Sequence, residues 1–115
     1  MRRGDLYWVD LEPVRGSEAN KVGPAVIVSN DAANRAADRN GRGLVTIAPI
    51  TSNISRILPF QVLLLAGVSG LTADSKVQAE QVRALSTDRL RNRIGELPFD
   101  AMKQIDDAIR LHLAL

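Results

Sequence analysis

The side chains that could do chemistry in this chain are arginines and hydroxyl groups. The sequence has no cysteine and one histidine, His112, which excludes thiol nucleophiles, thiolate metal sites and any mechanism that needs two histidines. No carboxylate cluster has the spacing of a metal site, and residues 41–43, Gly-Arg-Gly, are typical of a turn. Arginine binds phosphate through two parallel hydrogen bonds, and a hydroxyl can donate to developing negative charge. These groups suit phosphate chemistry without a metal or cofactor.

Cleavage of RNA is one reaction that such a set could support. The RNA 2′-OH can attack its own phosphate, so the protein must position it, move two protons and stabilise negative charge. Twelve of the 15 basic residues are arginine, and four of them lie within residues 83–93. A solvated basic face is the alternative interpretation of this charge. Aromatic residues make up only 3% of the chain, so a surface that stacks many bases is not expected.

The composition predicts one globular domain over residues 1–115. Hydrophobic residues make up 45% and charged residues 24%, with a net charge of +2. No apolar run approaches the roughly 20 residues that span a membrane, and no signal peptide is visible, so no membrane partner is expected. The absence of cysteine fits a cytoplasmic protein.

Short apolar segments separated by turn residues predict a mainly β fold. We expect strands at 6–11, 25–29, 44–51, 60–65, 76–79 and 94–97, a short helix at 31–39 and a single helical turn at 79–85. Met102, Ile105, Ile109 and Leu113 recur at helical spacing and predict a helix over 98–115. This pattern favours a small antiparallel β-barrel with short helices and a C-terminal α-helix. The long polar loop over 12–22 is either a charged flap beside a groove or an ordinary surface loop.

Five segments of the chain, taken in order, resemble those of a known family. Residues 4–11 read Gly-Asp-Leu-Tyr-Trp-Val-Asp-Leu, residues 16–18 read Gly-Ser-Glu, and residues 23–30 read Gly-Pro-Ala-Val-Ile-Val-Ser-Asn. Residues 47–52 end a strand with Pro-Ile-Thr-Ser, and residues 74–83 read Asp-Ser-Lys-Val-Gln-Ala-Glu-Gln-Val-Arg. In this order they resemble the MazF/PemK family of toxin endoribonucleases, with Ile-Gly-Glu-Leu at 94–97 as a further match.

The resemblance implies an SH3-like barrel, a homodimer, and sequence-specific, metal-independent cleavage of single-stranded RNA to 2′,3′-cyclic phosphate and 5′-OH ends. It also implies a cognate MazE-like antitoxin, whose acidic tail would occupy the RNA groove. The implied catalytic positions are Gly23, Thr51, Ser75 and Glu18. The implied RNA-binding residues are Arg15, Ser17, Lys21, Ser52, Asn53, Arg56, Gln81 and Arg83. From the residues alone, Thr51 could equally belong to a plain turn, and Gln81 could simply satisfy backbone groups.

One position departs from the family pattern. The family has a catalytic arginine before the proline, and this chain has Gly23. Loss of one preorganised donor lowers a rate by about 10² to 10³, so we expect an inactivated or strongly weakened enzyme. The change could be engineered, selected, or a mark of a natural homologue that kept dimerisation and antitoxin binding. Arg15, Lys21 or Arg56 would replace the charge only with accurate geometry.

Two rival functions remain open at the level of sequence. A toxin of the same fold could poison DNA gyrase by binding and cut nothing. A non-catalytic module could bind antitoxin or RNA. Thr51 and Ser75 argue against the first rival, and Gly23 keeps the second close to the nuclease interpretation.

Overall fold

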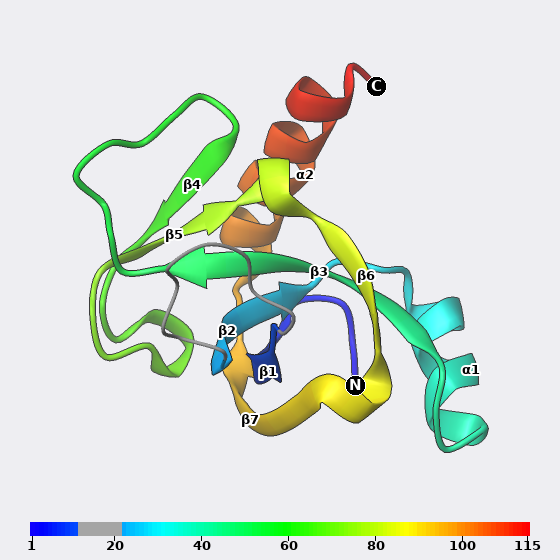
Figure 1. Cartoon of the computed structure of the whole chain (residues 1–115). Helices are drawn as coiled ribbons and strands as arrows, with labels where there is room; N and C mark the ends of the chain where they lie inside the picture. The colour runs from blue at the N-terminus through cyan, green and yellow to red at the C-terminus, as the bar shows by residue number, and fades with distance from the viewer. Residues whose placement is uncertain (12–21) are drawn as a thin grey trace.

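The computed structural model of the chain describes residues 1–11 and 22–115. In this part of the chain the backbone forms strands, two α-helices and three short 3₁₀ turns, labelled η (Figure 1). The elements run in the order β1 (Asp5–Asp10), β2 (Val22–Ile27), α1 (Asp31–Arg39), β3 (Leu44–Thr51), β4 (Gln61–Leu64), η1 (Val68–Gly70), β5 (Ser75–Gln78), η2 (Ala79–Gln81), β6 (Arg83–Ser86), η3 (Thr87–Arg89), β7 (Leu90–Glu96) and α2 (Phe99–Leu113).

Strand β3 organises the sheet because it pairs with three other strands. β2 lies along one edge of β3. Along the other edge, residues 44–47 pair with β6, and Ile50 and Thr51 pair with β5. β1 and then β7 extend the sheet beyond β2, and β4 extends it beyond β5, with every pair antiparallel. Within the described residues the two edge strands, β4 and β7, do not pair, so the sheet is barrel-like but not closed. The expected mainly β fold is confirmed.

Two predicted elements differ most from the structure, and tertiary pairing explains both. The turn expected over 79–85 is confined to Ala79–Gln81, because the following residues pair with β3 as β6 and bury Leu85. The short strand expected at 94–97 begins at Leu90 instead. Its exposed arginines interrupt the apolar pattern that predicts a strand. They are tolerated because β7 is an edge strand that pairs only with β1 among the described strands.

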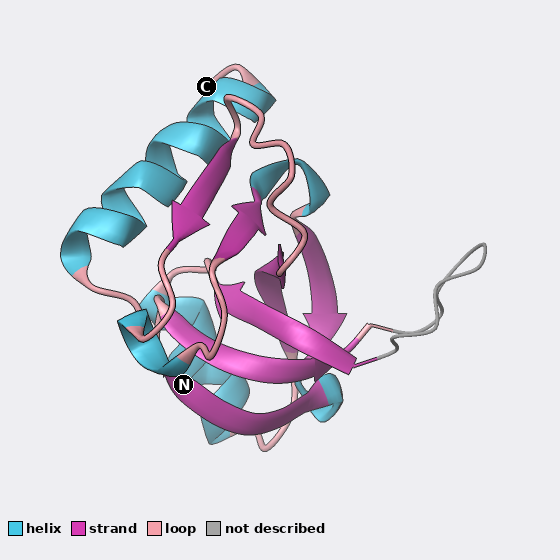
Figure 2. Cartoon of the chain, turned by 90° about the vertical axis from the view of Figure 1, so that its left-hand side faces the viewer, coloured by secondary structure: helices cyan, strands magenta, loops and turns pink. Residues whose placement is uncertain are grey.

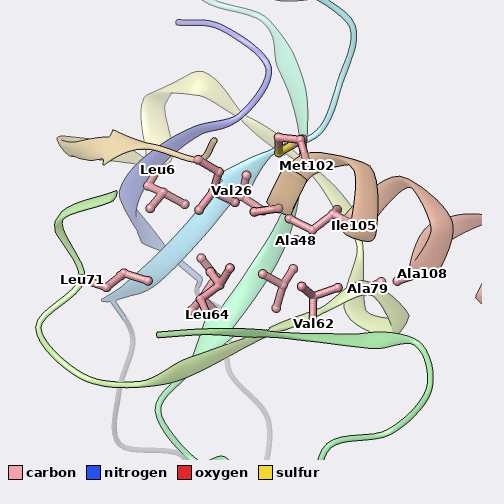
Figure 3. Packing of buried hydrophobic residues seen from close by; sticks show 14 residues of the cluster. Leu6, Val26, Ala48, Val62, Leu64, Leu71, Ala79, Met102, Ile105 and Ala108 are labelled. Atoms are coloured by element: carbon pink, nitrogen blue, oxygen red, sulfur yellow. The ribbon is translucent and has the colours of Figure 1, made fainter. Parts of the chain in front are cut away.

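Alternation along the strands divides the core into two clusters. Val26 and Ala48 point to one face, where Met102 and Ile105 of α2 cover them (Figure 3). Ala25, Ile27 and Ile47 point to the other face, where Ala37 of α1 packs. In Figure 2, α2 lies beside β4 along one side of the sheet. The helix predicted over 98–115 is confirmed at Phe99–Leu113, but Leu113 is exposed and lies outside the buried stripe.

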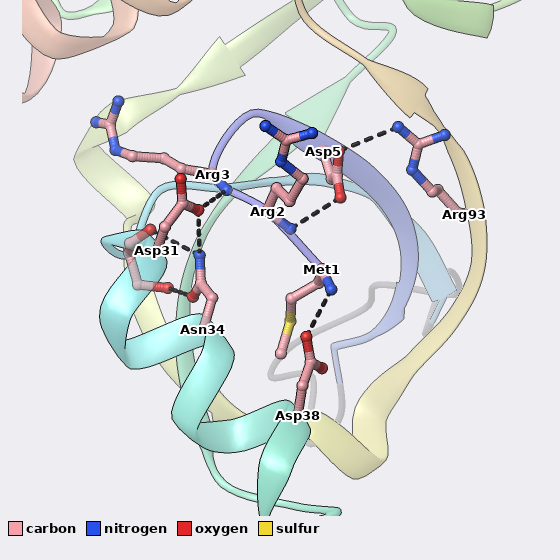
Figure 4. Close-up of polar contacts among 9 residues, drawn as sticks. Met1, Arg2, Arg3, Asp5, Asp31, Asn34, Asp38 and Arg93 are labelled. Atoms are coloured by element: carbon pink, nitrogen blue, oxygen red, sulfur yellow. Dashed lines mark hydrogen bonds and ion pairs between the residues drawn. The ribbon is translucent and has the colours of Figure 1, made fainter.

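Polar contacts hold the start of the chain against β1 and α1 (Figure 4). Asp5 is 4% exposed and accepts hydrogen bonds from the backbone N–H of Arg2 at 2.9 Å and from the Arg93 guanidinium at 3.1 Å. Asp31, in the first turn of α1, accepts from the backbone N–H of Arg3 at 2.7 Å. This hydrogen bond is the main reason that the pKa of Asp31 lies below its ordinary value. The network fixes the strand that carries Trp8.

Candidate functional site

A cleft of about 740 Å³ opens where β2 begins and β3 ends. Its walls come from β1, β2, β3, β5, β6, β7 and the turns η1 and η2. Six residues implied by the family resemblance line it, namely Gly23, Thr51, Ser52, Ser75, Gln81 and Arg83. The structure therefore brings together motifs that are separated by up to sixty positions in the sequence.

Gly23 lies inside β2, opposite Val9 of β1. The strand was expected to begin only at residue 25, because proline rarely occurs inside a strand. Pro24 is tolerated here because the pairing of β2 with β3 begins at Ala25, so the proline nitrogen needs no partner on that side. A Cβ atom added at Gly23 would lie 3.5 Å from Leu11 Cδ1, an ordinary van der Waals contact. The backbone thus has no need for glycine at this position.

Thr51 ends β3 in the same cleft as Gly23. The pairing of β2 with β3 stops at Ala25 and Pro49, and Gly23 and Thr51 each lie two residues beyond it. Both residues line the cleft at this end of the two strands. Thr51 is half-buried, and its Oγ1 accepts a hydrogen bond from the backbone N–H of Asn53 at 3.2 Å. The hydroxyl hydrogen can still be donated toward the cleft.

Ser75 reaches the cleft from the other face of the β3–β5 pair. Its neighbour Lys76 lies opposite Thr51, so Ser75 points with Val77 toward the apolar core. Ser75 is 5% exposed, and its hydroxyl donates to the carbonyl of Ala73 at 2.9 Å. The serine therefore fixes the turn before β5, and its oxygen retains lone pairs that can accept a hydrogen bond.

Arg83 is the only cation that lines the cleft among the described residues. It is half-buried, and its Nη1 donates to the carbonyl of Leu11 at 3.4 Å. Gln81 is exposed, and within the described part of the chain its side chain makes no hydrogen bond. The interpretation of Gln81 as a group that satisfies backbone atoms therefore finds no support here. Both side chains can contact a ligand.

Two implied residues in the described part of the chain, Asn53 and Arg56, do not line the cleft. Asn53 lies in the loop after β3, where its Oδ1 accepts from the Ser55 hydroxyl at 2.9 Å. Arg56 is exposed in the same loop, and its backbone carbonyl accepts a hydrogen bond from the Lys76 ammonium. Four implied residues, Arg15, Ser17, Glu18 and Lys21, lie outside the described residues, as does most of the loop expected at 12–22.

Sequence reasoning missed the apolar wall of the cleft. Trp8, Ile50, Leu71 and Ile94 line it and come from four separate segments. Period-two alternation could have placed Trp8 on the same face as Leu6, but only the fold reveals that this face opens into a cleft. His112 lies away from the cleft on α2, with its ring centroid 5.2 Å from that of Phe60.

The described ranges, 1–11 and 22–115, hold no group of three or more His, Cys, Asp or Glu side chains arranged to bind a metal ion. No helix in them has the length and apolar character needed to span a membrane.

Known proteins resemble the chain over its full length. It is 54% identical over 115 residues to endoribonuclease MazF9 of Mycobacterium tuberculosis, covering 100% of this chain and 98% of that protein. Endoribonuclease EndoA of Bacillus subtilis is 35% identical over 116 residues, covering 100% of this chain and 96% of that protein.

Solved structures and a family model agree with these relatives. A mycobacterial endoribonuclease in complex with its cognate antitoxin superposes with a TM-score of 0.79 at 28% identity, covering 100% of this chain and 96% of that one. MazF from Deinococcus radiodurans gives a TM-score of 0.75 at 25% identity, covering 100% and 97%. The model of the PemK-like, MazF-like toxins matches residues 2–113. The chain belongs to this family, the PemK-like, MazF-like toxins of type II toxin–antitoxin systems.

Proposed function

We propose that the chain is a toxin endoribonuclease fold that binds single-stranded RNA in the cleft and has lost most of its cleavage activity. The observation that carries the proposal is that Gly23 and Thr51 line the same cleft, Gly23 two residues before the β2–β3 pairing begins and Thr51 two residues after it ends. Relatives named as endoribonucleases at 54% and 35% identity support it. The active form would cut specific sequences without a metal and leave 2′,3′-cyclic phosphate and 5′-OH ends.

The proposed mechanism uses the 2′-OH of the substrate as nucleophile. It attacks the adjacent phosphorus, the bond to the 5′ oxygen breaks, and the leaving oxygen takes up a proton. The Thr51 hydroxyl donates to a non-bridging oxygen as negative charge builds on it. Arg83 holds a neighbouring phosphate, and Ser75 positions the strand. An arginine at position 23 would supply the positive charge beside Thr51, and glycine leaves that charge unsupplied.

The family also supports proposals about partners. Solved relatives include an endoribonuclease bound to its cognate antitoxin and MazE–MazF complexes. We expect this chain to bind a MazE-like antitoxin whose acidic segment competes with RNA, because Arg83 offers one charge to either ligand. We also expect a homodimer, and action on RNA in the cytoplasm. Residues 1–115 would act as one toxin domain.

A second candidate is a binding module that titrates antitoxin or RNA and cuts neither. Gly23 is the specific observation in its favour, because it removes one catalytic group and leaves the rest of the cleft in place.

One experiment separates the two candidates. A long single-stranded RNA is incubated in excess EDTA with the purified chain and, in parallel, with its Gly23→Arg variant, and new 5′-OH ends are mapped. Cleavage at the same sites by the arginine variant alone, or far faster by it, supports an endoribonuclease disabled at position 23. RNA binding without cleavage by either form would favour the module.

A further inference from the structure

Trp8 is the only tryptophan of the chain, and it lies in the cleft with 43% of its surface exposed. Leu6 and Val9 of the same strand are fully buried, whereas the Trp8 ring between them stays partly exposed. A large ring left in contact with water beside a ligand cleft is more informative than an exposed side chain on a convex face.

The backbone at Trp8 is irregular on one side. Trp8 pairs with Pro24 of β2, but the pairing with β7 shifts register between Tyr7 and Val9 and leaves Trp8 without a partner there. The extra residue of this bulge lies in β7, and bulges are common beside binding sites. The strand itself is held firmly, because Tyr7 and Val9 are each paired on both sides. The ring is therefore presented from a fixed backbone.

The surroundings of the ring match a flat, uncharged ligand with polar edges. Pro24, Ile50 and Ile94 continue the apolar wall next to Trp8. The lining also carries neutral polar groups, among them Thr72 and Gln78. The Gln78 amide makes no side-chain hydrogen bond within the described residues, so both its donor and its acceptor are available. No carboxylate lines the cleft among the described residues, and its one cation is Arg83.

We propose that Trp8 is the platform on which one unstacked nucleobase of the RNA stacks, with its polar edge turned toward Gln78. A base has an apolar face that an indole covers and an edge of donors and acceptors that an amide can pair with. The inference rests on the proposed RNA-binding function and adds to it the residue that contacts a base.

The lone tryptophan makes the test direct, because all indole emission comes from Trp8. The chain is titrated with homopolymeric RNA strands of about twelve nucleotides, 2′-O-methylated so that no cleavage can occur. A matched strand that lacks its bases has the same phosphates and serves as the comparison. Stacking predicts saturable quenching by at least one base-bearing strand and none by the abasic strand.

Variants separate a stacking role from a structural one. Trp8→Leu should weaken binding of the base-bearing strand about tenfold or more, and Trp8→Phe by less. The slope of log affinity against log salt should not change, because no phosphate contact is lost. Phe99→Leu is the matched control, since Phe99 is 81% exposed outside the cleft and should leave affinity unchanged. Melting temperatures show whether each variant is folded.

The outcomes are distinct. In one outcome, RNA binds without quenching Trp8 emission and with the same affinity for Trp8→Leu as for the parent chain. That result refutes the stacking platform and leaves the proposed function standing. Equal quenching by the abasic strand also refutes it, because the indole then responds to the backbone alone. If no strand binds at all, the inference and the proposed RNA-binding function fall together.

Discussion

Replacing Gly23 by arginine tests the catalytic reasoning most directly, because the structure accepts the larger residue. The Cβ atom would make one ordinary contact, with Leu11, and the backbone is extended within β2. Glycine inside a strand is less stable than alanine by roughly 0.5–1 kcal/mol, since its unfolded chain has more freedom. We therefore expect Gly23→Arg to keep or raise the melting temperature, so that any change in activity is not caused by unfolding.

The size of the gain follows from the position of the new side chain. Residue 23 and Thr51 line the same cleft just beyond the end of the β2–β3 pairing, so we expect the guanidinium to reach a phosphate that the threonine hydroxyl also contacts. One preorganised donor is worth about 10² to 10³ in rate. A further factor of about 10² would apply if the arginine also moves a proton. Ordering a long side chain offsets up to about 2 kcal/mol of this gain. We expect a net acceleration of at least about threefold where the arginine only donates, and of about 10²-fold or more where it also moves a proton.

Single-turnover cleavage of one mapped RNA site, in EDTA and with the protein in excess, measures this acceleration. Gly23→Ala is the matched control: it removes the glycine without adding charge and should stay as slow as the parent chain. Gly23→Lys adds charge without the bidentate hydrogen bonding of a guanidinium, so its cleavage rate should lie between those of the parent chain and Gly23→Arg. Equal rates for the parent chain and Gly23→Arg would refute the reasoning, because position 23 would then not be the missing catalytic group.

Four other perturbations test the rest of the structure. In the Gly23→Arg background, Thr51→Val should lower the single-turnover rate about 10²-fold with little loss of stability. A rate within about threefold of that of the Gly23→Arg variant would exclude the hydroxyl from catalysis. Arg83→Gln should weaken RNA binding at every sequence and reduce the salt slope by about one, as read by fluorescence anisotropy; an unchanged slope would remove the phosphate contact. The pKa of Asp31 is lowered in the folded state, so its stabilising effect is present above the ordinary value of 3.8 and is lost as pH falls through the lowered pKa. Urea unfolding at about pH 6 and pH 3 should show a smaller pH dependence for Asp31→Asn than for the parent, and identical profiles would contradict that assignment. Gly95→Ala would drive its Cβ into the Ser69 carbonyl oxygen and should lower the unfolding free energy by about 1–3 kcal/mol in chemical denaturation, whereas an unchanged midpoint would show that η1 moves aside freely.

The sequence predicted the elements whose residues all obey one period. The helix at Asp31–Arg39 was predicted with its observed bounds, because Asn30 caps it and residues 40 and 41, Asn-Gly, end it. β3 was also predicted with its observed bounds from an uninterrupted apolar run. β6 and the first half of β7 were missed because their backbones pair while many of their side chains remain exposed. Such strands are set by partners that are remote in sequence, and no local pattern encodes them.

The site shows the same division between local and remote information. Family motifs placed Thr51, Ser75 and Arg83 at the cleft, and the structure agrees that all three line it. Neither motif nor spacing could place Trp8 there, because its exposure depends on a register shift between β1 and β7. Asn53 and Arg56 followed Thr51 in sequence, but the chain turns away after β3 and leaves them outside.

The placement of these residues separates binding from catalysis. The groups proposed to hold RNA, Trp8 and Arg83, lie on β1 and β6, whereas the groups proposed to cleave it, position 23 and Thr51, lie at the ends of β2 and β3. Glycine at 23 changes only the second set, and its neighbours pack without it. The chain should therefore bind RNA with nearly the affinity of its Gly23→Arg form while cutting far more slowly. Under the proposed function, such a protein would hold RNA without cutting it and would compete with an active toxin for RNA or antitoxin.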